Sequence, residues 1–343
     1  MPEPFRRHSP TAVAAYHDLV SLLLDEAASE IRGAPTPRVR GNRTYWYDRY
    51  RVGTETKERY LGEDSEALRR RIDDHERLTQ EREARRRERT RLVRLLRSER
   101  LLGMDGATGS LLAALARAGT FRLGGVLVGT NAFRVYEGEL GLRLTLDQSA
   151  MTNDVDIASF ERLSLALGET VLPSVEEILA DFAFDPVPSL DAGKVWRWRQ
   201  SNSQTLVEFL TPSFNREEGL RELAALGVAA QSLHFLNYVV SEPIQAAAVY
   251  RDGILVQVPR PERFAIHKLI VSDRRAEGPD SLKSHKDRLQ AELLIAILSE
   301  DRPSELKEAY EDALSRGSRW RERLERALER APGALQCLQQ AAG

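Results

Sequence analysis

Cysteine is almost absent from this chain of 343 residues, because Cys337 is the single one. No disulfide can form within the chain, and a zinc site built from several cysteines is excluded. This composition is typical of a reducing compartment, so we expect a cytoplasmic protein. Long apolar runs are lacking as well. The longest, such as Leu293–Leu298, fall far short of the ~20 residues that a membrane-spanning helix needs, so no membrane partner is expected.

A strong net charge is also lacking. The chain has 50 Lys and Arg residues against 52 Asp and Glu residues, which leaves a net charge of −2. This balance excludes a uniformly basic surface for nucleic acids. The charges are unevenly distributed, however, and residues 1–100 carry an excess of basic groups. A polyanionic partner is therefore expected to meet the N-terminal part of the chain first.

The N-terminal part divides into three segments. Apolar residues at helical spacing predict a helix over residues 10–32, and the glycine and prolines of residues 33–37 end it. Residues 38–62 predict a β-hairpin that turns at Gly53-Thr54. Residues 64–101 predict one long charged helix, which Asp64 or Ser65 caps. Its interleaved glutamates favour an exposed connecting helix over an RNA-binding arginine helix.

Arginines and aromatic residues alternate in the predicted hairpin. The segments Tyr47–Gly53 and Arg59–Gly62 resemble the small β-hairpins of some integrases and transposases. Such side chains stack on bases and meet phosphates, so we interpret Arg49, Arg51 and Arg59 as contacts to nucleic acid. The alternative is a hairpin that packs on the helices and turns its arginines to water.

The rest of the chain changes character. Residues 110–275 alternate between strand-like and helical runs, and residues 260–343 are helical, with Pro303 between two helices. These patterns predict an α+β fold with domains at 1–102, 103–258 and 259–343. The expected strands are 125–128, 155–158, 195–199, 206–210, 235–240 and 254–258.

The sharpest local signal is Val126–Ala132, which predicts a buried strand, a glycine turn and the start of a helix. Gly129 has no side chain, so a phosphate can approach the backbone closely there. Thr130 is placed to cap the following helix, whose free N–H groups favour an anion. Neither a P-loop motif nor a dinucleotide-binding glycine motif is present.

Two aspartates follow this segment, within Thr152–Ile157. Asp154 and Asp156 are two residues apart on a predicted strand, so both carboxylates project from one face. Neighbouring carboxylates repel unless a positive group lies between them. Mg²⁺ takes that place well, because it prefers carboxylate oxygens together with substrate phosphates.

The glycine turn followed by Asp154-Val155-Asp156 resembles the nucleotidyltransferase fold shared with DNA polymerase β. The resemblance implies a mixed sheet with helices, NTP phosphates over Gly129 and Thr130, and two Mg²⁺ ions on the aspartates. It also implies a third carboxylate on a neighbouring strand, for which Glu208 is the candidate. The other interpretation of Glu208 is a salt bridge to Arg197 or Arg199 across a hairpin.

Two later segments extend the resemblance. Val258–Leu269 and Ser284–Asp287 are similar to segments of bacterial toxin-like nucleotidyltransferases of abortive-infection systems. That similarity implies that Lys268, Lys286 and Asp287 hold the triphosphate and shape the site. Threonine in place of the family's usual second glycine or serine is a departure at position 130.

Two functions are compatible with these features. The first is a Mg²⁺-dependent enzyme that moves an NMP from an NTP to the hydroxyl of an RNA, above all tRNA, or of a protein, in a toxin or defence role. The second is a non-catalytic, nucleotidyltransferase-like module that binds nucleic acid or has a regulatory role. The two retained aspartates favour the first function.

Overall fold

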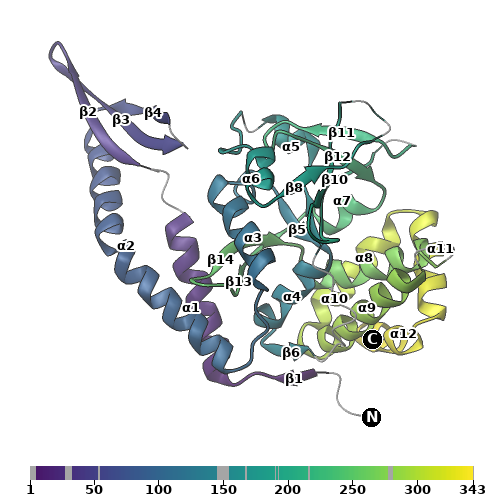
Figure 1. Cartoon of the computed structure of the whole chain (residues 1–343). Coiled ribbons are helices and arrows are strands. Elements are labelled where there is room, and N and C mark those ends of the chain that lie inside the picture. The colour runs from purple at the N-terminus through teal and green to yellow at the C-terminus, as the bar shows by residue number, and fades with distance from the viewer. Residues whose placement is uncertain are drawn as a thin grey trace.

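The computed structural model describes residues 5–27, 33–52, 55–144, 154–166, 168–189, 191, 193–214, 217–276 and 281–342. It confirms the α+β fold that the sequence predicts. Figure 1 shows an N-terminal arm, a central mixed sheet with its helices, and a C-terminal group of helices beside that sheet. No described helix is long and apolar enough to cross a membrane.

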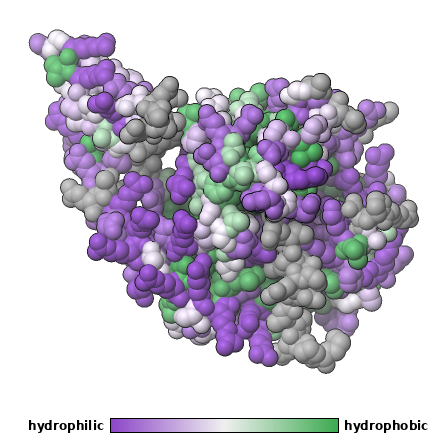
Figure 2. All heavy atoms as spheres, viewed as in Figure 1, coloured by the Kyte–Doolittle hydropathy of each residue, from purple (hydrophilic) through white to green (hydrophobic). Residues whose placement is uncertain are grey.

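The arm consists of α1 (Pro10–Ala27), α2 (Glu66–Ser98) and a small antiparallel sheet of β2 (Ala34–Arg40), β3 (Arg43–Val52) and β4 (Glu55–Glu63). The long helix is confirmed, and Ser65 caps it by accepting a hydrogen bond from the Leu68 backbone N–H at 3.3 Å. Figure 1 shows that α2 carries the small sheet at its far end. In Figure 2 hydrophilic side chains cover much of this arm, as the charged composition of α2 requires.

The predicted hairpin over 38–62 is wrong in one respect, because three strands are present. The sequence assigns the prolines at 35 and 37 only to the end of the first helix, yet both lie within β2, an edge strand that pairs with β3. An edge strand tolerates proline, since its missing N–H costs no hydrogen bond on the open side. The predicted turn at Gly53-Thr54 and the end of the first helix at 28–32 lie outside the described residues.

The central sheet has the strand order β11-β12-β10-β7-β5, with β9 and β8 extending from β10. In its middle β10 runs parallel to both β7 and β12, whereas β9 is antiparallel to β10. The strands are β5 (Val126–Val128), β7 (Val155–Ala158), β8 (Phe184–Pro186), β9 (Arg197–Gln200), β10 (Leu206–Pro212), β11 (Leu220–Leu223) and β12 (Val228–Leu233). Two further two-stranded pairs join β1 (Phe5–Arg7) to β6 (Leu142–Leu144), and β13 (Ile244–Ala248) to β14 (Ile254–Val258).

Helices cover this sheet and connect its strands. They are α3 (Gly106–Ala118), α4 (Gly129–Glu139), α5 (Glu161–Ala166), α6 (Val175–Asp181) and α7 (Leu236–Val239). The strand expected over 235–240 is wrong, because that segment forms α7 after Phe235 takes a left-handed conformation with φ 70°. A short apolar run fits a buried helix as well as a buried strand, so its hydrophobicity alone could not decide.

The C-terminal part is helical, as the sequence predicts, and its described residues form five helices. They are α8 (Pro261–Arg274), α9 (Ser281–Asp301), α10 (Pro303–Ser315), α11 (Ser318–Glu329) and α12 (Pro332–Ala342), and Pro303 begins α10. One buried apolar cluster extends from Met104 to Leu338 and therefore joins these helices to the central sheet. The domain boundaries expected at 102 and 258 stay a prediction.

Candidate active site

A pocket of about 420 Å³ lies where β5, β7 and β10 meet α4, α8 and α9. Segments far apart in sequence contribute to it, and most of them supply one or more polar side chains. The pocket brings together every residue that the sequence nominates for catalysis or NTP binding: Gly129, Thr130, Asp154, Asp156, Glu208, Lys268, Lys286 and Asp287. Their roles stay predictions, but their convergence is a property of the fold.

Gly129 is the first residue of α4 and has φ +66°, a conformation that side chains disfavour. A Cβ atom at this position would lie 2.2 Å from Oδ2 of Asp156. The glycine therefore permits close contact between the turn and the carboxylate. The expected cap at Thr130 is wrong, because Val128 holds the N-cap position without a side-chain hydrogen bond and Thr130 lies in the first turn.

Gly129→Ala is expected to abolish NTP binding, because the new methyl group displaces the Asp156 carboxylate. It should also lower the free energy of unfolding by about 2 kcal/mol or more, through strain and the clash. Gly227→Ala is the matched control, since Gly227 also has φ +66° but a methyl group there would meet no atom within 4 Å beyond its own chain neighbours. Thermal shift with NTP checks both variants, and equal behaviour of the two would contradict the contact argument.

The carboxylates lie on one wall of the pocket. Asp154 precedes β7, and its Oδ1 accepts a hydrogen bond from the Leu206 backbone N–H at 3.0 Å. Asp156 lies within β7, opposite Glu208 in the parallel register with β10. Burial, together with the negative charges of Glu208 and Asp154, raises the pKa of Asp156 to about 7. The ionised form of Asp156 is therefore disfavoured in this wall as long as no cation is bound.

The ion pair that the sequence offered for Glu208 is present, and the role of this residue as a metal ligand stays a prediction. Glu208 lines the pocket beside Asp156, and its Oε1 also lies 2.7 Å from Nε of Arg197. The antiparallel register of β9 and β10 places Arg197 directly opposite it. Across the residues that the structure describes, no set of three or more His, Cys, Asp or Glu side chains is arranged to hold a metal ion by itself.

Positive side chains occupy the α8 and α9 side of the pocket. Asp287 is buried and forms ion pairs with Lys268 and, at 2.6 Å, with Arg275. Burial by itself would raise the pKa of Asp287, but the charges of Lys268 and Arg275 outweigh it and lower the pKa. Burial and the neighbouring charge of Lys268 lower the pKa of Lys286 to about 8. Asp287 therefore holds two cations at the edge of the pocket.

The sequence interpretation missed Arg275. It follows Lys268 by seven residues, which is two helical turns, so the two side chains share one side of α8 and its C-terminal cap. That spacing was the available signal, but only the structure shows that Asp287 joins the two cations.

The three arginines predicted to contact nucleic acid do not line this pocket. Arg49 is exposed on β3, and Arg59 of β4 forms an ion pair with Glu169 at 3.6 Å. Arg51 lies on β3, but its side chain is outside the described residues. Contact of these arginines with nucleic acid stays a prediction.

Comparison with known families agrees with this arrangement. A family model described as "Nucleotidyltransferase" matches residues 106–315, which is more than half of the chain and includes every pocket residue named above. A second model, of a domain of unknown function (DUF6788), matches residues 14–70 and so covers most of α1 and the small sheet of the arm. Among curated proteins, none matches this chain. Because the first match spans most of the central sheet and the helices around the pocket, the chain belongs to this nucleotidyltransferase family.

Proposed function

We propose that this pocket binds an NTP with Mg²⁺ and transfers its NMP to the hydroxyl group of an acceptor. The observation that carries the proposal is the division of one pocket into an acidic wall and a basic wall. Asp154, Asp156 and Glu208 form the first, whereas Lys268 and Lys286 belong to the second. A triphosphate with bound cations fits between two such walls.

The carboxylates are suited to a divalent cation. Burial and then the negative charges of Glu208 and Asp154 raise the pKa of Asp156, and a bound cation would favour its ionised form. Asp154 and Asp156 would hold Mg²⁺, with Glu208 as the third candidate ligand. When bound, Mg²⁺ supplies Lewis-acid stabilisation of the charge that develops during phosphoryl transfer.

The chain's own groups position the reactants. Gly129 lets the phosphates approach the N-terminus of α4, where free N–H groups and the helix dipole favour anions. Lys268, Arg275 and Lys286 would neutralise the triphosphate, and Asp287 keeps the first two in place. The acceptor oxygen would then attack the α-phosphorus in line as the bond to the β-phosphate oxygen breaks, so that pyrophosphate leaves.

The direct test uses each of the four NTPs labelled at the α-phosphate. The full chain is incubated with Mg²⁺ and either total RNA or total protein, and the labelled product is separated from free nucleotide. We expect label in RNA from one preferred NTP, and none when EDTA replaces Mg²⁺. Stabilisation by RNA without any effect of NTP and Mg²⁺ on the melting temperature would instead indicate a binding module without catalysis.

Glu208→Gln separates the two roles of that carboxylate. If Glu208 helps to hold the metal, the variant should lose about 10- to 100-fold in transfer and most of the Mg²⁺-dependent stabilisation by NTP. Arg197→Gln is the matched variant, because it breaks the same ion pair and leaves the carboxylate in the pocket. Full transfer activity in Glu208→Gln, with similar losses of stability in both variants, would show that Glu208 serves only the ion pair.

A further inference from the structure

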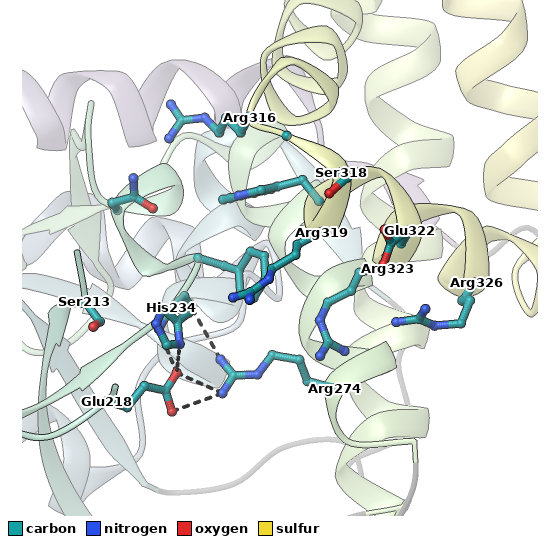
Figure 3. Close-up of a pocket in the computed structure, with 14 residues that line it drawn as sticks. Ser213, Glu218, His234, Arg274, Arg316, Ser318, Arg319, Glu322, Arg323 and Arg326 are labelled. Atoms are coloured by element: carbon teal, nitrogen blue, oxygen red, sulfur yellow. Dashed lines mark hydrogen bonds and ion pairs between the residues drawn. The ribbon is translucent and has the colours of Figure 1, made fainter. Parts of the chain in front are cut away.

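A second and larger cavity adjoins the candidate active site. It has a volume of about 870 Å³ and lies between the segment that follows β12, the short helix α7 and the helix α11 (Figure 3). His234 and Arg274 line both cavities, so the two share a wall. We call this second cavity the arginine cavity. None of the residues that line it was predicted as a site residue from the sequence.

The lining of the arginine cavity is basic. Five arginines line it, against two glutamates. Four of the arginines come from α11 and the residue two positions before it, whereas Arg274 comes from the end of α8. Figure 3 shows Arg274, Arg319 and Arg323 reaching into the same region from these two helices. An anionic ligand is the natural complement of such a lining.

Two carboxylates, the buried Asp273 and the half-buried Asp312, hold several of these guanidinium groups in place. Asp273 is buried and binds Arg323 at 2.8 Å and Arg326 at 2.9 Å. Asp312 holds Arg316 in the same way, at 3.0 Å. A guanidinium group has five N–H donors and a carboxylate occupies at most two of them, so such pairing orients the group without exhausting its donors. The arginines are therefore positioned in advance for phosphate oxygens.

Glu218 fixes the wall between the two cavities. Its Oε1 accepts hydrogen bonds from Nη2 of Arg274 at 3.0 Å and from the backbone N–H of His234 at 2.7 Å. Figure 3 shows these three residues joined in one network. Arg274 is thereby held where it faces both the arginine cavity and the NTP pocket.

We propose that the arginine cavity holds the phosphodiester backbone near the 3′ end of an RNA acceptor. This inference rests on the proposed function, because the terminal hydroxyl would extend past Arg274 to the α-phosphate of the NTP. Successive phosphates present fixed negative charges that planar guanidinium groups recognise, whereas a protein acceptor offers no such regular charge. Trp320 of α11 lines the cavity too, but it is buried and packed edge-on against Phe235 at 4.8 Å, so it supports the arginines structurally.

Charge reversal at Arg319 tests the proposal. Arg319 is exposed, lines the cavity, and takes part in none of the ion pairs that hold Arg316, Arg323 and Arg326, so Arg319→Glu should fold normally. Arg321→Glu is the matched control, because Arg321 is exposed on the same helix but does not line the cavity. Binding of a fluorescein-labelled single-stranded RNA is followed by anisotropy over a range of salt concentrations, without NTP.

We expect Arg319→Glu to weaken RNA binding about tenfold and to reduce the slope of log K against log salt by about one. Arg321→Glu should change the affinity less than about twofold, and NTP should raise the melting temperature of both variants as in the wild type. Equal losses in the two variants, or no loss in either, would overturn the assignment of the cavity.

The RNA-binding test of the arginine cavity and the labelling test of transferase activity can fail independently of each other. Selective loss of RNA binding in Arg319→Glu supports the cavity assignment even if no NTP labels any acceptor. Conversely, label transferred to a protein with equal rates by wild type and Arg319→Glu would support transferase activity and overturn the RNA assignment.

Discussion

Asp156→Asn is expected to reduce nucleotidyl transfer by about a thousandfold or more while stabilising the metal-free protein. The substitution removes a charge that would bind the catalytic cation, and it retains the volume of the side chain. In the metal-free protein the same charge is unfavourable, because Asp156 lies beside Glu208 and Asp154. Loss of activity with gain of stability is the expected signature of a residue selected for catalysis.

The effect on stability depends on pH in a defined direction. Asp156 has a pKa of about 7 in the folded protein and ionises near its ordinary value of 3.8 in the unfolded chain. Between these values the folded state binds the extra proton, so this residue's contribution to stability falls as the pH rises from about 4 to 7. The advantage of Asp156→Asn should therefore grow over this range and reach about 2–4 kcal/mol above pH 7.

Urea unfolding in EDTA at several pH values measures this difference, and label transfer from an NTP measures activity. Asp181→Asn serves as the control, because Asp181 is exposed at the end of α6 and lies outside the pocket. Wild-type transfer by Asp156→Asn would remove the catalytic assignment. A stability difference that is independent of pH would show that the pKa of Asp156 is not raised in the folded protein.

Local patterns explain which parts of this fold could be predicted. The strands Val155–Ala158 and Ile254–Val258 have the predicted bounds, because each is a short run of buried apolar residues with clear ends. The spacing of Asp154 and Asp156 also sufficed to place both carboxylates in one pocket, since side chains alternate along a strand. In both cases residues close in sequence carry the information.

Contacts between distant segments could not be derived in this way. Glu208 has Asp156 as its neighbour on one side and Arg197 on the other, because β10 is a central strand between β7 and β9. The sequence offered a metal site and a salt bridge as alternatives, whereas the strand order allows one side chain to take part in both. The arginine cavity could not be derived from the sequence for the same reason, since Arg274 lies on α8 and the other arginines lie on α11 or just before it, with α9 and α10 between.

The second large effect concerns Asp287, which we expect to be required for stability as well as activity. Asp287→Asn removes the negative charge that pairs with Lys268 and Arg275 and leaves both cations facing a neutral amide. Breaking a buried ion pair from one side is costly, because the remaining charge has lost its partner but not regained water. The side chain of Arg275 is 39% exposed, which lessens the cost for that partner. We expect a loss of about 2–4 kcal/mol in the free energy of unfolding.

A second substitution distinguishes a stranded charge from a packing defect. Lys268→Met added to Asp287→Asn removes the ammonium group that has lost its partner and should restore part of the stability. It should not restore transfer, because Lys268 would then no longer neutralise the triphosphate. Glu83→Gln is the control for an exposed ion pair, since Glu83 and Arg87 lie on the surface of α2. This substitution is expected to leave the urea midpoint of unfolding unchanged.

Urea unfolding of the single and double variants gives the coupling between the two sites, and NTP titration gives the apparent affinity. If Asp287→Asn alone unfolds too readily for assay, the double variant still tests the argument, because it should fold and yet bind NTP weakly. A double variant less stable than Asp287→Asn would show that Lys268 has other favourable contacts in the pocket, such as its position 5.3 Å from the ring centre of Phe264. Recovery of stability in the double variant would establish that the loss in Asp287→Asn comes from the ammonium group of Lys268 left without its partner.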